Sequence, residues 1–129
     1  MLVNGNCTIY NRLYNPDTKN YTYHKTNISG IWSHVDSKVS VTDTGIHAAD
    51  ICKIRIPRGN AAAVSYKEPA AYDGTGWTIQ NGDYILLEAD GPDITKPSDI
   101  DKTRRQFFKI ISWSDNRYGT TPHWRIEGV

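Results

Sequence analysis

The chain has 129 residues, which fits one domain, residues 1–129. Its formal charge of +1 argues against a protein whose main work is to coat nucleic acid. Apolar residues make up 38% of the chain, and 8 Tyr and 4 Trp stand against 2 Phe, so the core must include aromatic side chains with a polar atom. The N-terminal residues lack the basic and apolar regions of a secretory leader, and no apolar run reaches membrane-spanning length, so we expect a soluble protein made inside a cell.

The first part of the chain predicts strands separated by turns. Residues 7–14 and 21–26 flank the turn cluster NPDTKN and predict a hairpin. Residues 28–36 alternate between Ile31, Ser33 and Val35 on one face and Trp32 and His34 on the other. Gly30 within this strand predicts a bulge or close packing. A further short strand is expected over residues 38–45.

The middle of the chain predicts two more strands. Residues 49–57 place Cys52, Ile54 and Ile56 on one face, and Pro57 ends the strand. We expect residues 77–89 to be a strand segment interrupted by a turn at 80–83, with residues 84–87 buried on both faces.

The last strands, residues 106–115 and 123–128, predict a terminal antiparallel hairpin. Alternation predicts two faces on the first of them, one with Phe108 and Ile110 and the other with Phe107, Lys109, Ile111 and Trp113. On the second, Trp124 and Ile126 share the core face. The opposite face is expected to display Lys109, His123, Arg125 and Glu127 for pairing across strands.

Two long loops separate these strands, residues 58–76 and residues 89–105. No stretch of ten residues has the apolar spacing of a helix, and Ser98 caps one turn at most. The sequence therefore predicts an all-β fold, a small antiparallel β-barrel with long loops and at most one short helix.

Catalytic and metal-binding motifs are absent from the sequence. Cys7 and Cys52 follow no metal spacing and lie in apolar strands, which favours two reduced, buried thiols, and the sequence does not say whether they are neighbours. No GxSxG motif, P-loop or metal-ligating histidine pair occurs. We expect no enzyme, no metal and no cofactor. Tyr and Trp side chains are expected in the core or in interfaces rather than on a ligand platform.

Four segments in order resemble small minor capsid proteins of tailed phages and prophages of Gram-positive hosts. They are CTIYNRLYN, TDTGIHAADICKIRIP, WTIQNGDYILLE and FFKIISWSDNRYGTTPHWRIEG, and they cover nearly all of residues 7–128. The motif of the terminal hairpin falls on Asp115, Asn116, Arg117, His123 and Trp124. KPSDID is similar to the acidic loop of that family, although Lys96 stands where the family has an acid.

The resemblance implies a head-closure, or stopper-like, protein of the virion neck. Such a protein forms a homo-oligomeric ring in the particle, closes the DNA-filled head and provides the tail attachment surface. Its partners would be portal and adaptor proteins above, tail proteins below and, passively, packaged DNA, without a membrane. The resemblance gives the five motif residues structural roles.

The acidic loop is the candidate interface or lumen-facing element. Its candidate residues are Asp90, Asp93, Asp99, Asp101, Arg104 and Arg105. Carboxylates that face DNA repel it and reduce sticking. Two alternatives to the neck protein stay open: a tail terminator or tail-completion ring subunit, and a small β-domain that binds carbohydrate or nucleic acid.

Overall fold

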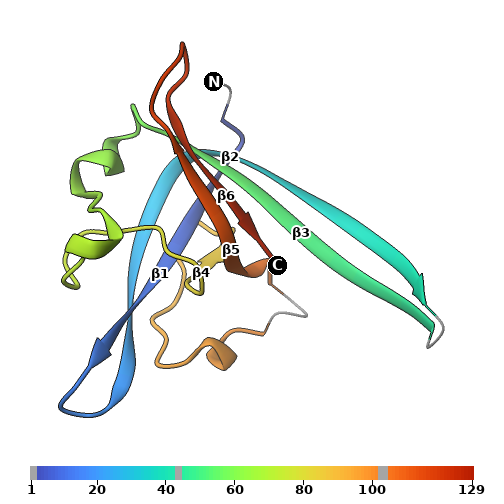
Figure 1. The fold of residues 1–129 in the computed structure, drawn as a ribbon, viewed down its shortest axis with the longest axis horizontal. Helices are drawn as coiled ribbons and strands as arrows, with labels where there is room; N and C mark the ends of the chain where they lie inside the picture. Colours follow the sequence, from blue (N-terminus) through green and yellow to red (C-terminus); the bar gives the residue numbers. More distant parts are fainter. Residues whose placement is uncertain (1–2, 43–44, 102–104) are drawn as a thin grey trace.

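The computed structural model describes residues 3–42, 45–101 and 105–129, and its strands form one antiparallel sheet that closes in a ring (Figure 1). Around the ring the order is β1-β2-β3-β6-β5-β4, and β4 pairs again with β1. The strands are β1 (Gly5–Asn15), β2 (Asn20–Thr42), β3 (Gly45–Pro57), β4 (Tyr84–Leu86), β5 (Phe107–Asn116) and β6 (His123–Gly128).

Strand β2 is long and serves two parts of the ring. Residues 20–31 pair with β1, and residues 32–42 pair with β3. At the junction Gly30 adopts a φ of +79°, and the register with β1 skips it, since Gly5 faces Ile31 while Asn6 faces Ser29. An extra residue on one strand bends it and increases its twist. The bulge predicted at Gly30 is therefore confirmed.

The main core fills the inside of the ring. It consists of the inward side chains of the strands together with Trp77 and Ile79, which lie in the loop before β4, and all of these are buried. Cys52, Ile54 and Ile56 lie here, as their alternation predicts, and so do Trp124 and Ile126.

The alternation expected in β5 is wrong at Trp113. Ile110 is buried, and Trp113, three residues later, also packs against the main core. A register shift between Ile110 and Ser112 explains this, because a bulge moves later side chains to the opposite face.

The segment expected as strand over residues 77–89 is mostly loop. Only Tyr84–Leu86 is strand, and Trp77 forms an isolated bridge with Tyr66. The reason is that the backbone here finds other partners: Thr78 exchanges hydrogen bonds with the Asn11 side chain, and Trp77 bonds to the backbone of the 58–76 segment.

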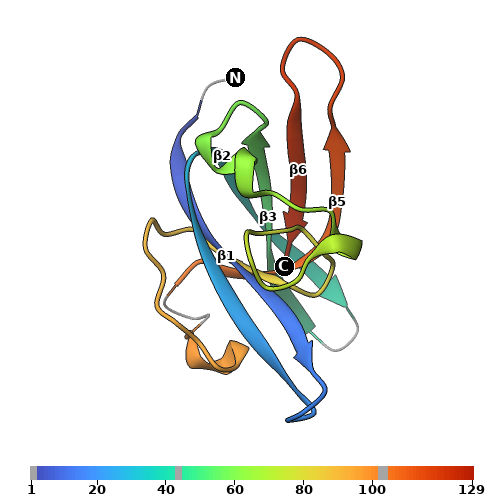
Figure 2. The same ribbon diagram turned by 90° about the vertical axis from the view of Figure 1, so that its left-hand side faces the viewer.

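The loops contain short 3₁₀ turns. In the described part of the chain these are Ala61–Ser65, Pro69–Ala71 and Pro97–Asp99. Figure 2 shows the 58–76 segment, in green, folded against one side of the sheet. Its Tyr66 ring lies 4.6 Å from the Trp124 ring between centroids, which ties the segment to the core. Among the described residues there is no helix long and apolar enough to cross a membrane.

Candidate interface loop and terminal hairpin

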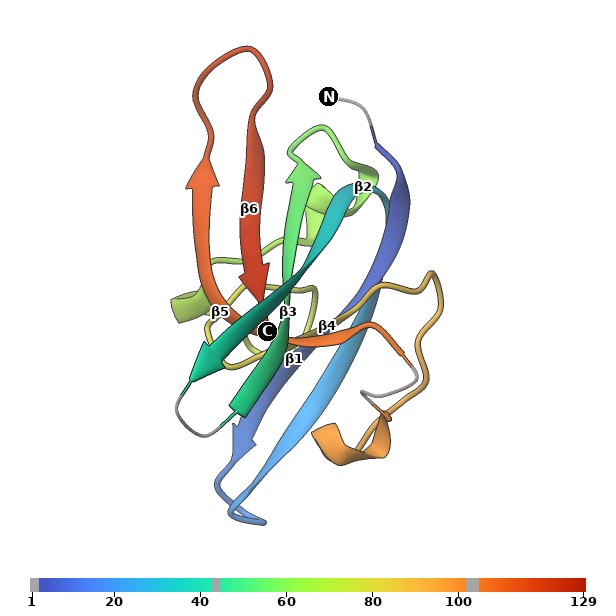
Figure 3. The same cartoon turned by 90° about the vertical axis from the view of Figure 1, so that its right-hand side faces the viewer.

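Residues 7–11 of β1 are buried on both faces of the strand. Cys7 and Ile9 point into the main core, and Thr8 and Tyr10, on the other face, are also fully buried. The cover on that outer face is the segment that follows β4. Figure 3 shows this segment, in orange, beside the β1–β2 hairpin. The acidic loop is residues 88–105, of which the structure describes 88–101 and 105.

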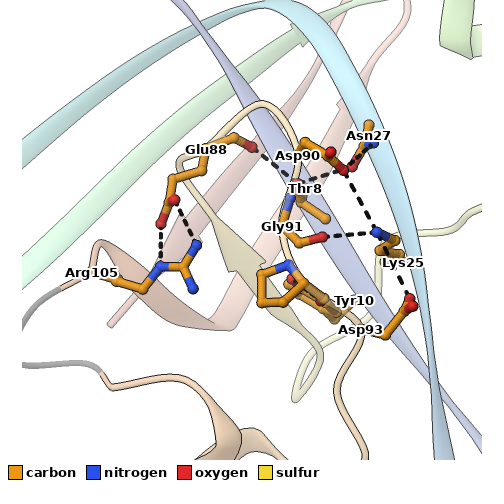
Figure 4. Close-up of polar contacts among 10 residues, drawn as sticks. Thr8, Tyr10, Lys25, Asn27, Glu88, Asp90, Gly91, Asp93 and Arg105 are labelled. Carbon is orange, nitrogen blue, oxygen red and sulfur yellow. Dashed lines mark hydrogen bonds and ion pairs between the residues drawn. The ribbon is translucent and has the colours of Figure 1, made fainter.

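Two side chains of β1 hold the start of the acidic loop (Figure 4). The Thr8 hydroxyl lies 3.0 Å from the Glu88 carbonyl oxygen and accepts a hydrogen bond of 2.9 Å from the Gly91 N–H. The Tyr10 hydroxyl donates to the Pro92 carbonyl oxygen at 2.7 Å. Burial raises the pKa of Tyr10 to about 12, so its hydroxyl stays protonated as a donor at neutral pH.

The acidic loop also contributes its own small core. Ile94 and Ile100 are buried with Tyr10, Leu86 and Phe107 in a second cluster outside the ring. This loop is therefore a packed part of the fold and does not hang free from it. Burial of two isoleucines contributes roughly 2 kcal/mol each before entropy is counted.

The exposed acids of the loop surround one lysine. Lys25 of β2 donates a hydrogen bond of 2.9 Å to the Gly91 carbonyl oxygen and lies 3.6 Å from Asp90 and 3.8 Å from Asp93 (Figure 4). The side chains of Asp90 and Asp93 are 80% and 91% exposed. Asn27 donates to Asp90 at 3.2 Å. These two carboxylates are consequently held at the surface while remaining open to a partner.

The other charged residues of the loop have local roles. Asp99 accepts hydrogen bonds from the backbone N–H groups of Thr95 and Lys96, which lowers its pKa and fixes the 3₁₀ turn at Pro97–Asp99. Asp101 accepts a backbone hydrogen bond from Arg105 through its carbonyl oxygen. Arg104 lies outside the described residues.

Arg105 closes the base of the loop. Its Nε and a terminal nitrogen each donate 2.6 Å hydrogen bonds to the two oxygens of Glu88, and these bonds lower the pKa of Glu88. A bidentate pair fixes both the distance and the orientation of the two ends. The ends of the acidic loop are thus joined as well as anchored.

The terminal hairpin is organised by Asp115. Arg58, just after β3, donates to both of its carboxylate oxygens, one bond being 2.9 Å, and Arg117 donates at 2.7 and 3.1 Å. Burial of Asp115 acts to raise its pKa, but the bonds from Arg58 and Arg117 outweigh it and the pKa is lowered. Arg117 also reaches Glu68 at 3.3 Å. Asp115 therefore links the hairpin turn at Arg117 to the segment that follows β3.

The remaining motif residues also bind within the fold. Asn116 and His123 face each other at the hairpin, with 3.3 Å between Nδ2 and Nε2. Trp124 is buried, and the Arg58 guanidinium lies 4.5 Å from its ring centroid. The pairing expected across strands is wrong for Arg125, whose partner at 3.0 Å is Glu127 of the same strand.

A buried polar group ties β1 to the turn before β4. Asp83 is fully buried and accepts hydrogen bonds from the Asn11 side chain at 2.9 Å, from Gln80 at 3.0 Å and from the Arg12 N–H at 3.3 Å. Desolvation nevertheless raises the pKa of Asp83. The sequence indicated only a turn here, although Asn11 within an apolar strand signals a buried partner.

The anchors of the acidic loop were not found from the sequence. Thr8, Tyr10, Lys25 and Glu88 come from distant parts of the chain, and only the folded ring brings them together. The sequence carries one signal. Cys7 and Ile9 lie on one face of the strand, and the large aromatic Tyr10 lies on the other, which is typical of a strand covered on both faces.

The cysteines are free and buried, as expected. Both lie in the main core. Burial raises the pKa of both thiols, that of Cys52 to about 12. Within the described residues no three His, Cys, Asp or Glu side chains gather in a group able to hold a metal ion.

A family model matches residues 2–129, almost the entire chain, and its description is "Family of unknown function (DUF6751)". No curated protein matches the chain. No solved structure matches it either.

Proposed function

We propose, for a chain that belongs to the DUF6751 family, a structural role in the neck of a tailed phage or prophage particle. In this proposal the closed sheet is a small β-barrel of the head-closure type. Copies of it form a ring that closes the DNA-filled head and presents the tail attachment surface. The ring would contact portal or adaptor proteins on one side and tail proteins on the other.

The observation that carries the proposal is that the motif residues of the terminal hairpin make contacts within the fold. Asp115, Arg117, His123 and Trp124 bind or pack within the hairpin and against Arg58, so the residues behind the resemblance maintain a shape. Structural use of a motif fits a subunit whose surface must match its neighbours.

The acidic loop supports the same role. Its packed side rests on β1 and β2, while Asp90 and Asp93 point their exposed carboxylates outward. A rigid loop with surface acids suits contact with a neighbouring protein, or a channel wall to which DNA does not adhere. Loops that carry function are commonly positioned by a rigid scaffold in this way.

The test is electron microscopy of lysates from a phage or prophage in which this gene is deleted. Empty heads beside free, complete tails are expected, because heads that are not closed lose their DNA and cannot join tails. A plasmid copy of the gene should restore full particles, which controls for effects on neighbouring genes.

Two other results would redirect the proposal. Full heads with abnormally long or unfinished tails would assign the protein to tail termination instead. Intact, infectious particles would reject a neck function altogether, and a ligand screen on sugars and nucleic acids would then be the next step.

A further inference from the structure

The hairpin between β2 and β3 extends beyond the closed ring. Residues 37–42 of β2 pair with residues 45–50 of β3, and with no other strand of the described chain. β1 pairs with β2 only up to Ile31, and β6 pairs with β3 only from Cys52. We name residues 37–42 and 45–50 the arm, and Figure 1 shows it projecting from the body of the molecule.

An arm of this kind leaves backbone groups without sheet partners. Both of its outer edges carry N–H and C=O groups that a further strand can pair with. A two-stranded ribbon alone is only marginally stable in water and gains its stability from further strands or packing. The arm spans roughly 20 Å, at about 3.3 Å for each residue of a strand.

The sequence of the arm suits a pairing surface. Register pairs Val39 with Ala48 and Val41 with Ile46 along the two strands of the arm. β-branched residues favour extended strands. The arm is thus a long strand pair with two edges that have no partner strand in the described chain.

A second open edge lies on β5. β5 pairs with β4 from Phe107 to Lys109. The next residue, Ile110, makes backbone hydrogen bonds on the same side to Gly82 and Asp83. From residue 111 to residue 116 the described chain offers β5 a partner on one side alone, which is β6. Ile111 on this stretch is 45% exposed.

We propose that the arm of one copy pairs with the open edge of β5 in a second copy. The two stretches are equal in length, 37–42 and 111–116, and the same chain carries both. Such added strands gain affinity from backbone hydrogen bonds, with side chains setting the register. The occupant is therefore a second copy of this chain.

The contact has a direction, which matters for the assembly. An arm that meets a different surface gives a head-to-tail interface, and successive head-to-tail contacts close into a ring or continue as a filament. An arm that meets another arm would stop at a two-fold dimer. This inference deepens the proposed function, on which it rests for the ring inside a particle, but the contact itself can be tested on purified protein.

The first experiment places a charge on the β5 edge. Ile111→Lys should weaken self-association by about tenfold or more, because an edge lysine opposes the docking of another strand. The matched control is Val64→Lys, which adds the same charge at an apolar side chain that is 94% exposed on a different segment. Sedimentation over a range up to millimolar protein gives the association, and thermal unfolding confirms that both variants are folded.

The second experiment identifies the two surfaces. Ser40→Cys and Ser114→Cys are made as separate proteins and treated with a short bis-maleimide, singly and mixed. Native Cys7 and Cys52 are buried and should not react. Cross-linked dimers are expected in the mixture and not from either variant alone.

Three results would overturn the arm-to-edge contact. They are dimers from Ser40→Cys alone, equal association of the Ile111→Lys and wild-type proteins, and a protein that remains monomeric without cross-links at millimolar concentration. A gene deletion that leaves particles intact would reject the neck function but not this contact, so the two failures are distinguishable.

Discussion

The hydroxyl of Tyr10 donates a hydrogen bond of 2.7 Å to the carbonyl oxygen of Pro92, across 82 positions of sequence. This bond joins the first strand to the acidic loop where Tyr10 and the neighbouring Gly91 are buried, although Pro92 itself is exposed. The loop that carries the candidate interface acids is therefore tied directly to the first strand.

Gly91 has no room for a side chain. A Cβ at this position would lie 2.2 Å from the Tyr10 hydroxyl oxygen and 3.1 Å from Thr8 Cβ. Gly91→Ala should lower the free energy of unfolding by about 1–3 kcal/mol, the usual range for overpacking. Gly59→Ala is the matched control, since nothing lies within 4 Å of its Cβ. Urea titration measures both, and equal stability of the two variants would contradict the tight packing of the loop.

Asp115 should stabilise the protein at neutral pH and not in strong acid. Its pKa is lowered in the folded state, so its contribution is present above the unfolded pKa and is lost as the pH falls through the folded pKa. Asp115→Asn should cost about 2 kcal/mol at pH 7, as expected for hydrogen bonds to a charged group.

Glu127→Gln is the control for Asp115. Glu127 pairs with Arg125 on the surface, where ion pairs contribute less than about 1 kcal/mol. Thermal unfolding of both variants from pH 7 down to pH 2 should show the Asp115→Asn deficit shrinking with acid. A deficit that stays constant would mean that the Arg58 and Arg117 bonds are not its cause.

The two thiols should resist labelling in the native protein. Burial raises the pKa of Cys52 to about 12 and that of Cys7 further, so little thiolate exists at pH 8. Mass spectrometry after maleimide treatment should show no label in buffer and two labels in denaturant. Rapid labelling of either thiol in buffer would show that its part of the core opens readily.

The exposed acids offer a separation of function from stability. The double substitution of Asp90 and Asp93 by Asn should change stability by less than about 0.5 kcal/mol, because both side chains are mostly exposed. Under the proposed function it should reduce the yield of filled, tailed particles. Asp17→Asn, on the exposed turn of the β1–β2 hairpin, is the control. Normal particle yield from the double variant would remove these carboxylates from the interface.

The buried face of a strand could be predicted from the sequence where every second residue is apolar. Cys52, Ile54 and Ile56 are an instance, because the period of a strand leaves them no other face. Trp113 and the 77–89 segment were not predictable, since a bulge and the burial of Trp77 depend on neighbours distant in sequence.

The candidate site was predictable only in part. The acids of the loop and the residues of the hairpin stand out by composition and motif, and the structure places them in two separate regions. Their anchors do not stand out, because Arg58 and Lys25 are ordinary surface residue types until the ring brings them to Asp115 and Asp93. Long-range pairing of this kind has no local signal.

The continuous path of β2 has a mechanical consequence. The strand runs without a break from the β1 hairpin, through the bend at Gly30, into the arm. A pull on the arm is therefore transmitted along two strands, through β2 to the hairpin that supports the acidic loop and through β3 to its pairing with β6. Force applied to the arm thus reaches two parts of the ring without passing through a loop.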